Sequence, residues 1–109
     1  MSSFQIVTET TAIAVLATSA ATPLPTLPGG LTGWQNAVSL YNSGTTAVYV
    51  ALGGSAIIAA IPAAGSSAQG YPIPAGATVT LNAGGAGYIA TIAAATGNTL
   101  YVTAGVDQA

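Results

Sequence analysis

VSLYNSGTTAVYVAL, residues 38–52, decides the fold, because apolar and polar residues alternate up to a turn and alternate again beyond it. Asn42, Ser43 and Gly44 supply the backbone tolerance and the short polar side chains that a tight reversal needs. One face of the two flanking runs is apolar, and its residues are Val38, Leu40, Val48, Val50 and Leu52. The stretch therefore predicts a β-hairpin that buries this face.

Later segments repeat the plan of short runs separated by turns. Residues 56–61 are apolar and predict a strand buried on both faces, and residues 63–70 predict a surface loop. Residues 71–74 are flanked by proline, which places them at a sheet edge. Alternation predicts three further strands, over residues 78–82, 88–93 and 99–104. Because no segment has the pattern of a helix, the chain is expected to be all-β, an antiparallel β-sandwich or jelly roll.

The first 33 residues differ in composition, because they are rich in Thr, Ala and Pro. Residues 4–7 and 12–15 alternate, which predicts one or two extended pieces, and the prolines of TPLPTLP favour a polyproline-like strap. We therefore expect residues 1–33 to form an extended N-terminal arm, laid over its own domain or a neighbour, and residues 34–109 to form the β-sandwich domain. Trp34 stands at the junction, as a core plug or as an anchor in a partner pocket.

Charge is almost absent. Of 109 residues none is Lys, Arg or His, and the acidic residues are Glu9 and Asp107. Nucleic acids and anionic membranes are bound through Lys and Arg, so neither is an expected partner. No uninterrupted apolar run approaches the ~20 residues that a membrane-spanning helix requires. Without cysteine there is no disulfide or thiolate metal site.

Catalysis is not expected, because the usual proton-transfer and nucleophilic side chains are limited to Glu9 and Asp107. These lie in the two terminal segments, whereas a two-carboxylate glycosidase needs them across one cleft. Two carboxylates are also a poor start for a metal site. The glycines at 84–87 lack the Lys and helix of a phosphate-binding loop and predict a turn. No catalytic residue, metal or cofactor is predicted.

The predicted outward faces carry Thr, Ala, Ser and Tyr where soluble monomers usually place charged residues at exposed sheet edges. This composition favours faces and edges covered by other subunits, in an assembly that is insensitive to salt. Tyrosine is enriched in protein interfaces and sugar-binding faces, although it also simply favours strands. The candidate interface residues are Phe4, Ile6, Trp34, Tyr41, Tyr49 and Tyr101.

Residues 38–106 resemble small β-sandwich structural proteins of tailed bacteriophages, of the capsid decoration (cement) or fibre-head type. The shared features are a strand that ends in Asn before a Gly turn, the strand VYVALG, a Pro-x-Gly turn before a Thr/Val strand, and the final strand LYVTAG. The resemblance implies a non-enzymatic virion protein on the capsid surface, which bridges major capsid protein subunits, forms a homo-oligomer and extends an arm to a neighbour.

Two other functions fit the same residues. One is a carbohydrate- or receptor-binding module at a fibre tip, which would use the tyrosine-bearing faces. The other is a secreted filament or surface-layer subunit, which would polymerise by donor-strand exchange of the arm.

Overall fold

The structure is a computed structural model that describes residues 4–24, 34–84 and 86–108. These residues contain eight strands and no helix, so none of them belongs to a helix that could cross a membrane. The strands are β1 (Phe4–Val15), β2 (Ala20–Pro23), β3 (Trp34–Asn42), β4 (Val48–Gly53), β5 (Tyr71–Ile73), β6 (Thr78–Asn82), β7 (Tyr88–Ala93) and β8 (Asn98–Gln108).

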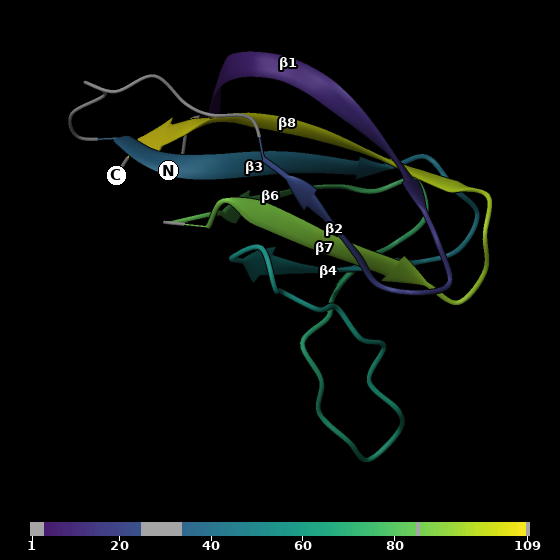
Figure 1. The fold of residues 1–109 in the computed structure, drawn as a ribbon. Coiled ribbons are helices and arrows are strands. Elements are labelled where there is room, and N and C mark those ends of the chain that lie inside the picture. Colours follow the sequence, from purple (N-terminus) through teal and green to yellow (C-terminus); the bar gives the residue numbers. More distant parts are fainter. Residues whose placement is uncertain (1–3, 25–33, 85, 109) are drawn as a thin grey trace.

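The strands form two antiparallel four-stranded sheets that pack face to face. Sheet A has the order β1-β8-β3-β6 and sheet B the order β2-β7-β4-β5. Figure 1 shows sheet A as the upper layer and sheet B as the lower one. Except from β4 to β5, every connection carries the chain from one sheet to the other. The predicted all-β sandwich is confirmed, and this winding of eight strands between two sheets is that of a jelly roll.

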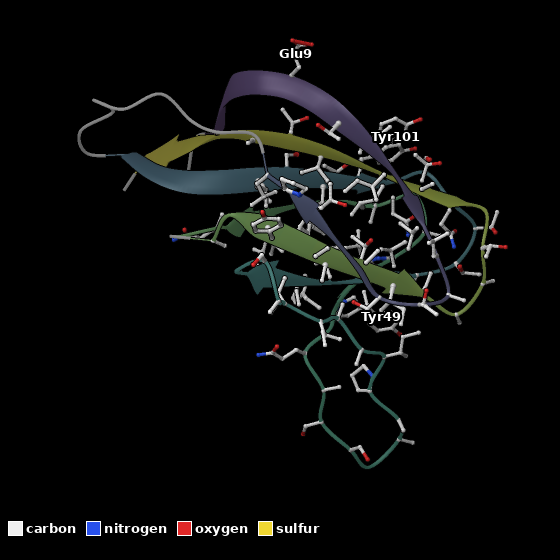
Figure 2. The ribbon with its side chains drawn as sticks, viewed as in Figure 1. Glu9, Tyr49 and Tyr101 are labelled. Atoms are coloured by element: carbon white, nitrogen blue, oxygen red, sulfur yellow. The ribbon has the colours of Figure 1, made fainter. Side chains whose placement is uncertain are left out.

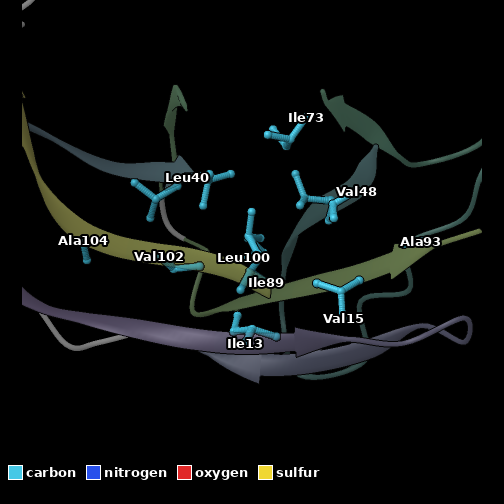
Figure 3. Close-up of a cluster of buried hydrophobic side chains, with 12 residues drawn as sticks. Ile13, Val15, Leu40, Val48, Ile73, Ile89, Ala93, Leu100, Val102 and Ala104 are labelled. Atoms are coloured by element: carbon cyan, nitrogen blue, oxygen red, sulfur yellow. The ribbon is translucent and has the colours of Figure 1, made fainter. Parts of the chain in front are cut away.

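The core lies between the two sheets and is dominated by a cluster of buried apolar side chains (Figure 3). Its members are Ile13, Val15, Val38, Leu40, Val48, Val50, Ile73, Ile89, Ala93, Leu100, Val102 and Ala104. Burying one Leu, Ile or Val stabilises the fold by roughly 1.5–3 kcal/mol before ordering costs. Both sheets contribute, so packing of one sheet on the other holds the fold together without disulfides or ion pairs in the described residues.

The predicted hairpin at residues 38–52 is wrong, although its buried face is right. Val38 and Leu40 of β3 and Val48 and Val50 of β4 are all buried in the core. However, β3 pairs with β8 and β6, and β4 pairs with β5 and β7 in the opposite sheet. Residues 43–47 separate the strands, which is longer than the two-residue turn of the commonest hairpins. The turn therefore forms an arch between the sheets.

The strand predicted at residues 56–61 is also wrong. These residues belong to the β4–β5 loop (residues 54–70), which extends away from sheet B (Figure 1). Ile58 is 67% exposed, whereas Ala59 is buried. Both sides of β4 are already taken by β5 and β7, so no place in the sheet remains beside it. The surface loop at residues 63–70 and the edge position of β5 are confirmed.

The described part of the expected arm lies within its own sandwich. β1 pairs with β8 in sheet A, and β2 pairs with β7 in sheet B. Ile13 and Val15 of β1 belong to the core. Residues 4–24 are therefore extended, as expected, and pack on the same chain. The proline strap from residue 25 onward and the boundary at residues 33 and 34 lie outside or at the limit of the described residues.

Candidate interaction surface

The outer face of sheet A is built by alternation along its four strands. Because Ile13, Leu40 and Leu100 point into the core, their strand neighbours point outward. We define this face by Thr10, Ala12, Ala14, Ser39, Tyr41, Thr78, Thr80, Thr99, Tyr101 and Thr103. All ten side chains are uncharged and present hydroxyl groups, methyl groups and two aromatic rings. The face offers hydrogen bonds and apolar contact to a partner but no ion pair.

Tyr41 and Tyr101 form the aromatic part of this face. They lie opposite each other on β3 and β8, with ring centroids 6.0 Å apart and ring planes inclined by 22°. Ala12 and Thr78 continue the row on either side. Such cross-strand aromatic pairs stabilise a sheet by about 0.2–1 kcal/mol. Tyr41 and Tyr101 nevertheless remain 41% and 38% exposed, so the stacked pair is open to a partner.

A row of hydroxyl groups runs beside the tyrosine pair. The Oγ1 atoms of Thr10 and Thr103 are 2.6 Å apart, which joins β1 to β8. Ser39 lies opposite Thr103 and also opposite Thr80, so the row crosses all four strands. These side chains are short and present their hydroxyl groups along one row of the face.

Tyr49 is separated from the other two tyrosines. It projects from β4 on the outer side of sheet B, and Figure 2 shows it on the opposite side of the sandwich from Tyr101. It is half-buried, and its Cβ lies beside Gly70 at the base of the β4–β5 loop. The structure thus brings together Tyr41 and Tyr101 and leaves Tyr49 apart.

The other predicted interface residues are located through their backbones. Phe4 and Ile6 lie in β1, opposite Asp107 and Gly105 of β8. Trp34 begins β3, opposite Gln108. Their side chains are outside the described part of the structure, so their predicted role in an interface stays a prediction.

The two carboxylate residues lie on neighbouring strands. Glu9 is in the stretch of β1 where the register shifts between Ile6 and Thr10, and its side chain points away from the sandwich (Figure 2). Asp107 is on β8, opposite Phe4. Asp107 lies three positions along β8 from the part of that strand beside Glu9, which at ~3.3 Å per residue is about 10 Å. The two terminal segments are therefore parts of one strand pair.

Sequence reasoning missed a pair of buried asparagines where chain connections cross between the sheets. Asn42 was expected only as a turn residue, yet it has no exposed surface. Its Nδ2 donates to the carbonyl oxygens of Thr46 and Ile73, each at 2.9 Å, and its Oδ1 accepts from the Gly44 N–H at 2.9 Å. Asn42 thereby joins the arch after β3 to strand β5 of the opposite sheet.

Asn98, the first residue of β8, forms hydrogen bonds at the same end of the sandwich. Its Oδ1 accepts from the N–H groups of Thr45 and Thr46, at 3.0 and 3.3 Å. Its Nδ2 donates to Thr46 Oγ1 at 2.8 Å and to the Ala95 carbonyl at 3.1 Å. The TGN sequence indicates a turn here, but no sequence signal shows that the amide is buried against another turn. These two asparagines join the connections at this end of the sandwich by hydrogen bonds.

A second exposed region lies on the sheet B side. The large apolar side chains exposed there come from the β4–β5 loop, from β5 and from the β1–β2 turn, and are Leu16, Ile58, Ile61 and Tyr71. The loop is tied to the β1–β2 turn because the Ala59 N–H donates to Ser19 Oγ at 2.9 Å. The wrong prediction of a buried strand at residues 56–61 concealed Ile58 and Ile61.

In comparisons with known proteins, no protein-family model, no curated protein and no solved structure matches this chain.

Proposed function

We propose that this chain is a non-enzymatic structural protein of a virus particle, a capsid decoration protein that stabilises the shell by bridging capsid subunits. The observation that carries the proposal is the outer face of sheet A, where four strands present uncharged, short and aromatic side chains in one layer. Eight-stranded jelly rolls are also common in capsid and lectin domains, which is an analogy at the level of the fold.

The size of the face limits how it would work. Strands ~4.8 Å apart and about 3.4 Å per residue give the face roughly 300 Å². A stable interface usually buries about 800 Å² on each partner, so one face alone supports only weak attachment. A decoration protein of this kind would therefore hold the shell through several copies at once, because linked weak contacts raise the overall affinity.

The proposal is tested with capsid shells from the source of the chain, prepared without decoration protein. In co-sedimentation, the full chain should load to a fixed number of copies per shell. Low or molar salt should change the loading little, because none of the ten side chains that define the face is charged and, among the described side chains, Glu9 is the single carboxylate near them. If the chain failed to load onto shells at every salt concentration tested, the proposal would be contradicted.

A charged variant locates the contact. Ala12 is exposed on the outer face of sheet A beside Tyr101, and Ala21 is exposed on β2 of sheet B. Ala12→Lys should reduce shell loading at least tenfold, because an unpaired ammonium would be desolvated in the contact. Ala21→Lys adds the same charge on the other layer and should load like the unchanged protein. Equal loading of both variants would exclude this face.

A second candidate function is recognition of a carbohydrate receptor, which the stacked pair of Tyr41 and Tyr101 favours. Two exposed rings side by side offer the apolar surface and hydroxyl groups that a sugar ring can pack against. A glycan array would show specific binding that Tyr101→Ala abolishes. Tyr49→Ala is the matched control, because Tyr49 lies on the opposite side of the sandwich. Binding lost in both variants would point to a fold defect.

A further inference from the structure

The four outermost strands of the sandwich differ in how they are protected against pairing with other chains. β1 has a register shift between Ile6 and Thr10 and carries Glu9 there. β2 has four residues and ends in Pro23, and β5 has three with Pro72 at its centre. Bulges, charges, prolines and shortness are the devices by which edge strands avoid association. Each of these three edges has at least one of them.

β6 (Thr78–Asn82) is the unprotected edge. Its sequence TVTLN contains no proline and no charge, and its register with β3 is unbroken from Tyr41↔Thr78 to Ala37↔Asn82. In an antiparallel ladder, alternate backbone N–H and C=O groups point away from the paired neighbour. Among the described residues no strand lies beyond β6, so this side of the strand presents the template for one more strand.

At β6, the edge of the core is only partly covered. Val79 and Leu81 point inward and pack against the core cluster, yet both are only half-buried. Thr78 and Thr80 point outward and are exposed. A strand added beside β6 would cover Val79 and Leu81 if it brought apolar side chains to the same positions.

We propose that the added strand is β6 of a second copy, in antiparallel pairing about a two-fold axis at Thr80. In this register Thr80 faces its own equivalent, and Val79 of each copy faces Leu81 of the other. Outside, Thr80 faces Thr80 and Thr78 of each copy faces Asn82 of the other. The sequence is thus self-complementary, with polar beside polar outside and apolar beside apolar inside. A two-fold interface requires such self-complementarity, because the same patch serves both copies.

The pairing would join two copies of sheet A into one eight-stranded sheet. Their outer faces would then form a single face of roughly 600 Å², close to the about 800 Å² that one partner usually buries. That this joined face would bind the shell rests on the proposed function. The pairing itself does not depend on shell binding.

Sedimentation velocity of the full chain tests the pairing directly. We expect a monomer–dimer equilibrium between micromolar and millimolar concentration, because a five-residue strand pair is a small interface. Thr80→Lys should abolish the dimer, since two like charges would face each other across the axis. Ala21→Lys places the same charge on an exposed edge strand of sheet B and should leave the equilibrium unchanged. An unchanged protein that stays monomeric, or a dimer that persists in Thr80→Lys, would overturn the inference.

Disulfide cross-linking tests the β6 pairing independently. The chain contains no cysteine, so an introduced cysteine is its single thiol. Opposite residues of an antiparallel pair have Cα atoms about 4.5–5.5 Å apart, which is within the range of a disulfide. Thr80→Cys should therefore oxidise rapidly to a covalent dimer at concentrations where Ala21→Cys remains monomeric. Equal rates for the two variants would contradict the register.

Shell loading of the same variants separates the inference from the proposed function. A dimer that ignores shells would overturn the proposed function and leave the β6 pairing standing. A chain that is monomeric alone and loses shell loading in Thr80→Lys would overturn the pairing between copies and make a strand of the shell the partner of β6.

Discussion

Gly44 lies directly against the side chain of Asn98, so that a Cβ atom at position 44 would overlap the Asn98 amide. The contact joins the arch between β3 and β4 to the connection between β7 and β8. The same amide binds the backbone of Thr45 and Thr46, so the arch is both packed on Asn98 and hydrogen-bonded to it.

Gly44→Ala should therefore destabilise the protein by about 2–4 kcal/mol, because the methyl group must displace the Asn98 side chain from its hydrogen bonds. Urea denaturation followed by tryptophan fluorescence measures the change. Gly54→Ala is the control, since nothing lies within 4 Å of the added Cβ and its φ is not positive. Its stability should match or slightly exceed that of the unchanged protein. Equal effects of the two substitutions would contradict the packing.

Asn98→Ala should cost a similar amount, about 2–4 kcal/mol. The substitution leaves the N–H groups of Thr45 and Thr46 without their acceptor and the Ala95 carbonyl without its donor. Thr96→Ala, at an exposed position in the same turn, should change stability by less than about 0.5 kcal/mol. A loss confined to Asn98→Ala in thermal unfolding would support the network, and no loss would refute it.

Thr91→Val should stabilise the protein by about 1 kcal/mol. Thr91 is buried on β7, and its Oγ1 has no hydrogen-bond partner within the described part of the chain. Replacing a buried unpaired hydroxyl by a methyl group of similar size removes its desolvation cost. Thr103→Val is the control, because the Thr103 hydroxyl shares a hydrogen bond with Thr10. This substitution should not increase the stability. A lower midpoint for Thr91→Val would indicate that the hydroxyl is satisfied in solution.

Tyr41 and Tyr101 should be energetically coupled. In a double-mutant cycle with alanine, the coupling should be about 0.5–1 kcal/mol, as for other stacked cross-strand pairs. The cycle of Tyr41 with Tyr49 is the control and should give none, because these residues belong to different sheets. Coupling of equal size in both cycles would show that the substitutions act through the fold as a whole.

Alternation predicted which side chains enter the core, and it was right for Val38, Leu40, Val48 and Val50. Burial depends on the local period of two, which the sequence contains. Pairing was not predicted correctly, because the partner of β3 on one side is β8, a distant strand in which Leu100 pairs with Asn42 and Gln108 with Trp34. The arch at residues 43–47 looks like a hairpin turn in sequence, since both need the same small and polar residues.

For the candidate surface, too, the facing of side chains was predictable from the sequence and the strand pairing was not. The outward positions of Tyr41 and Tyr101 follow from alternation, but their contact follows from the register between β3 and β8. Ile58 was expected to be buried but is exposed. The expectation failed because an apolar run between a glycine turn and Pro62 has the composition of a buried strand. Asn42 and Asn98 could not be identified as buried, because polar residues in turns are usually exposed and their partners come from distant segments.

The pairing of β1 with β8 also governs when the protein can fold during its synthesis. The ribosome makes β1 first of the eight strands and β8 last, and the register joins Phe4 to Asp107. Sheet A has β8 as its second strand, so the place of β1 in the sheet, beside β8, is not available until β8 has emerged. Folds dominated by such distant contacts fold slowly, in milliseconds to seconds. Until β8 arrives, Ile13 and Val15 are exposed to water, and the nascent chain depends on dilution or chaperones to avoid aggregation.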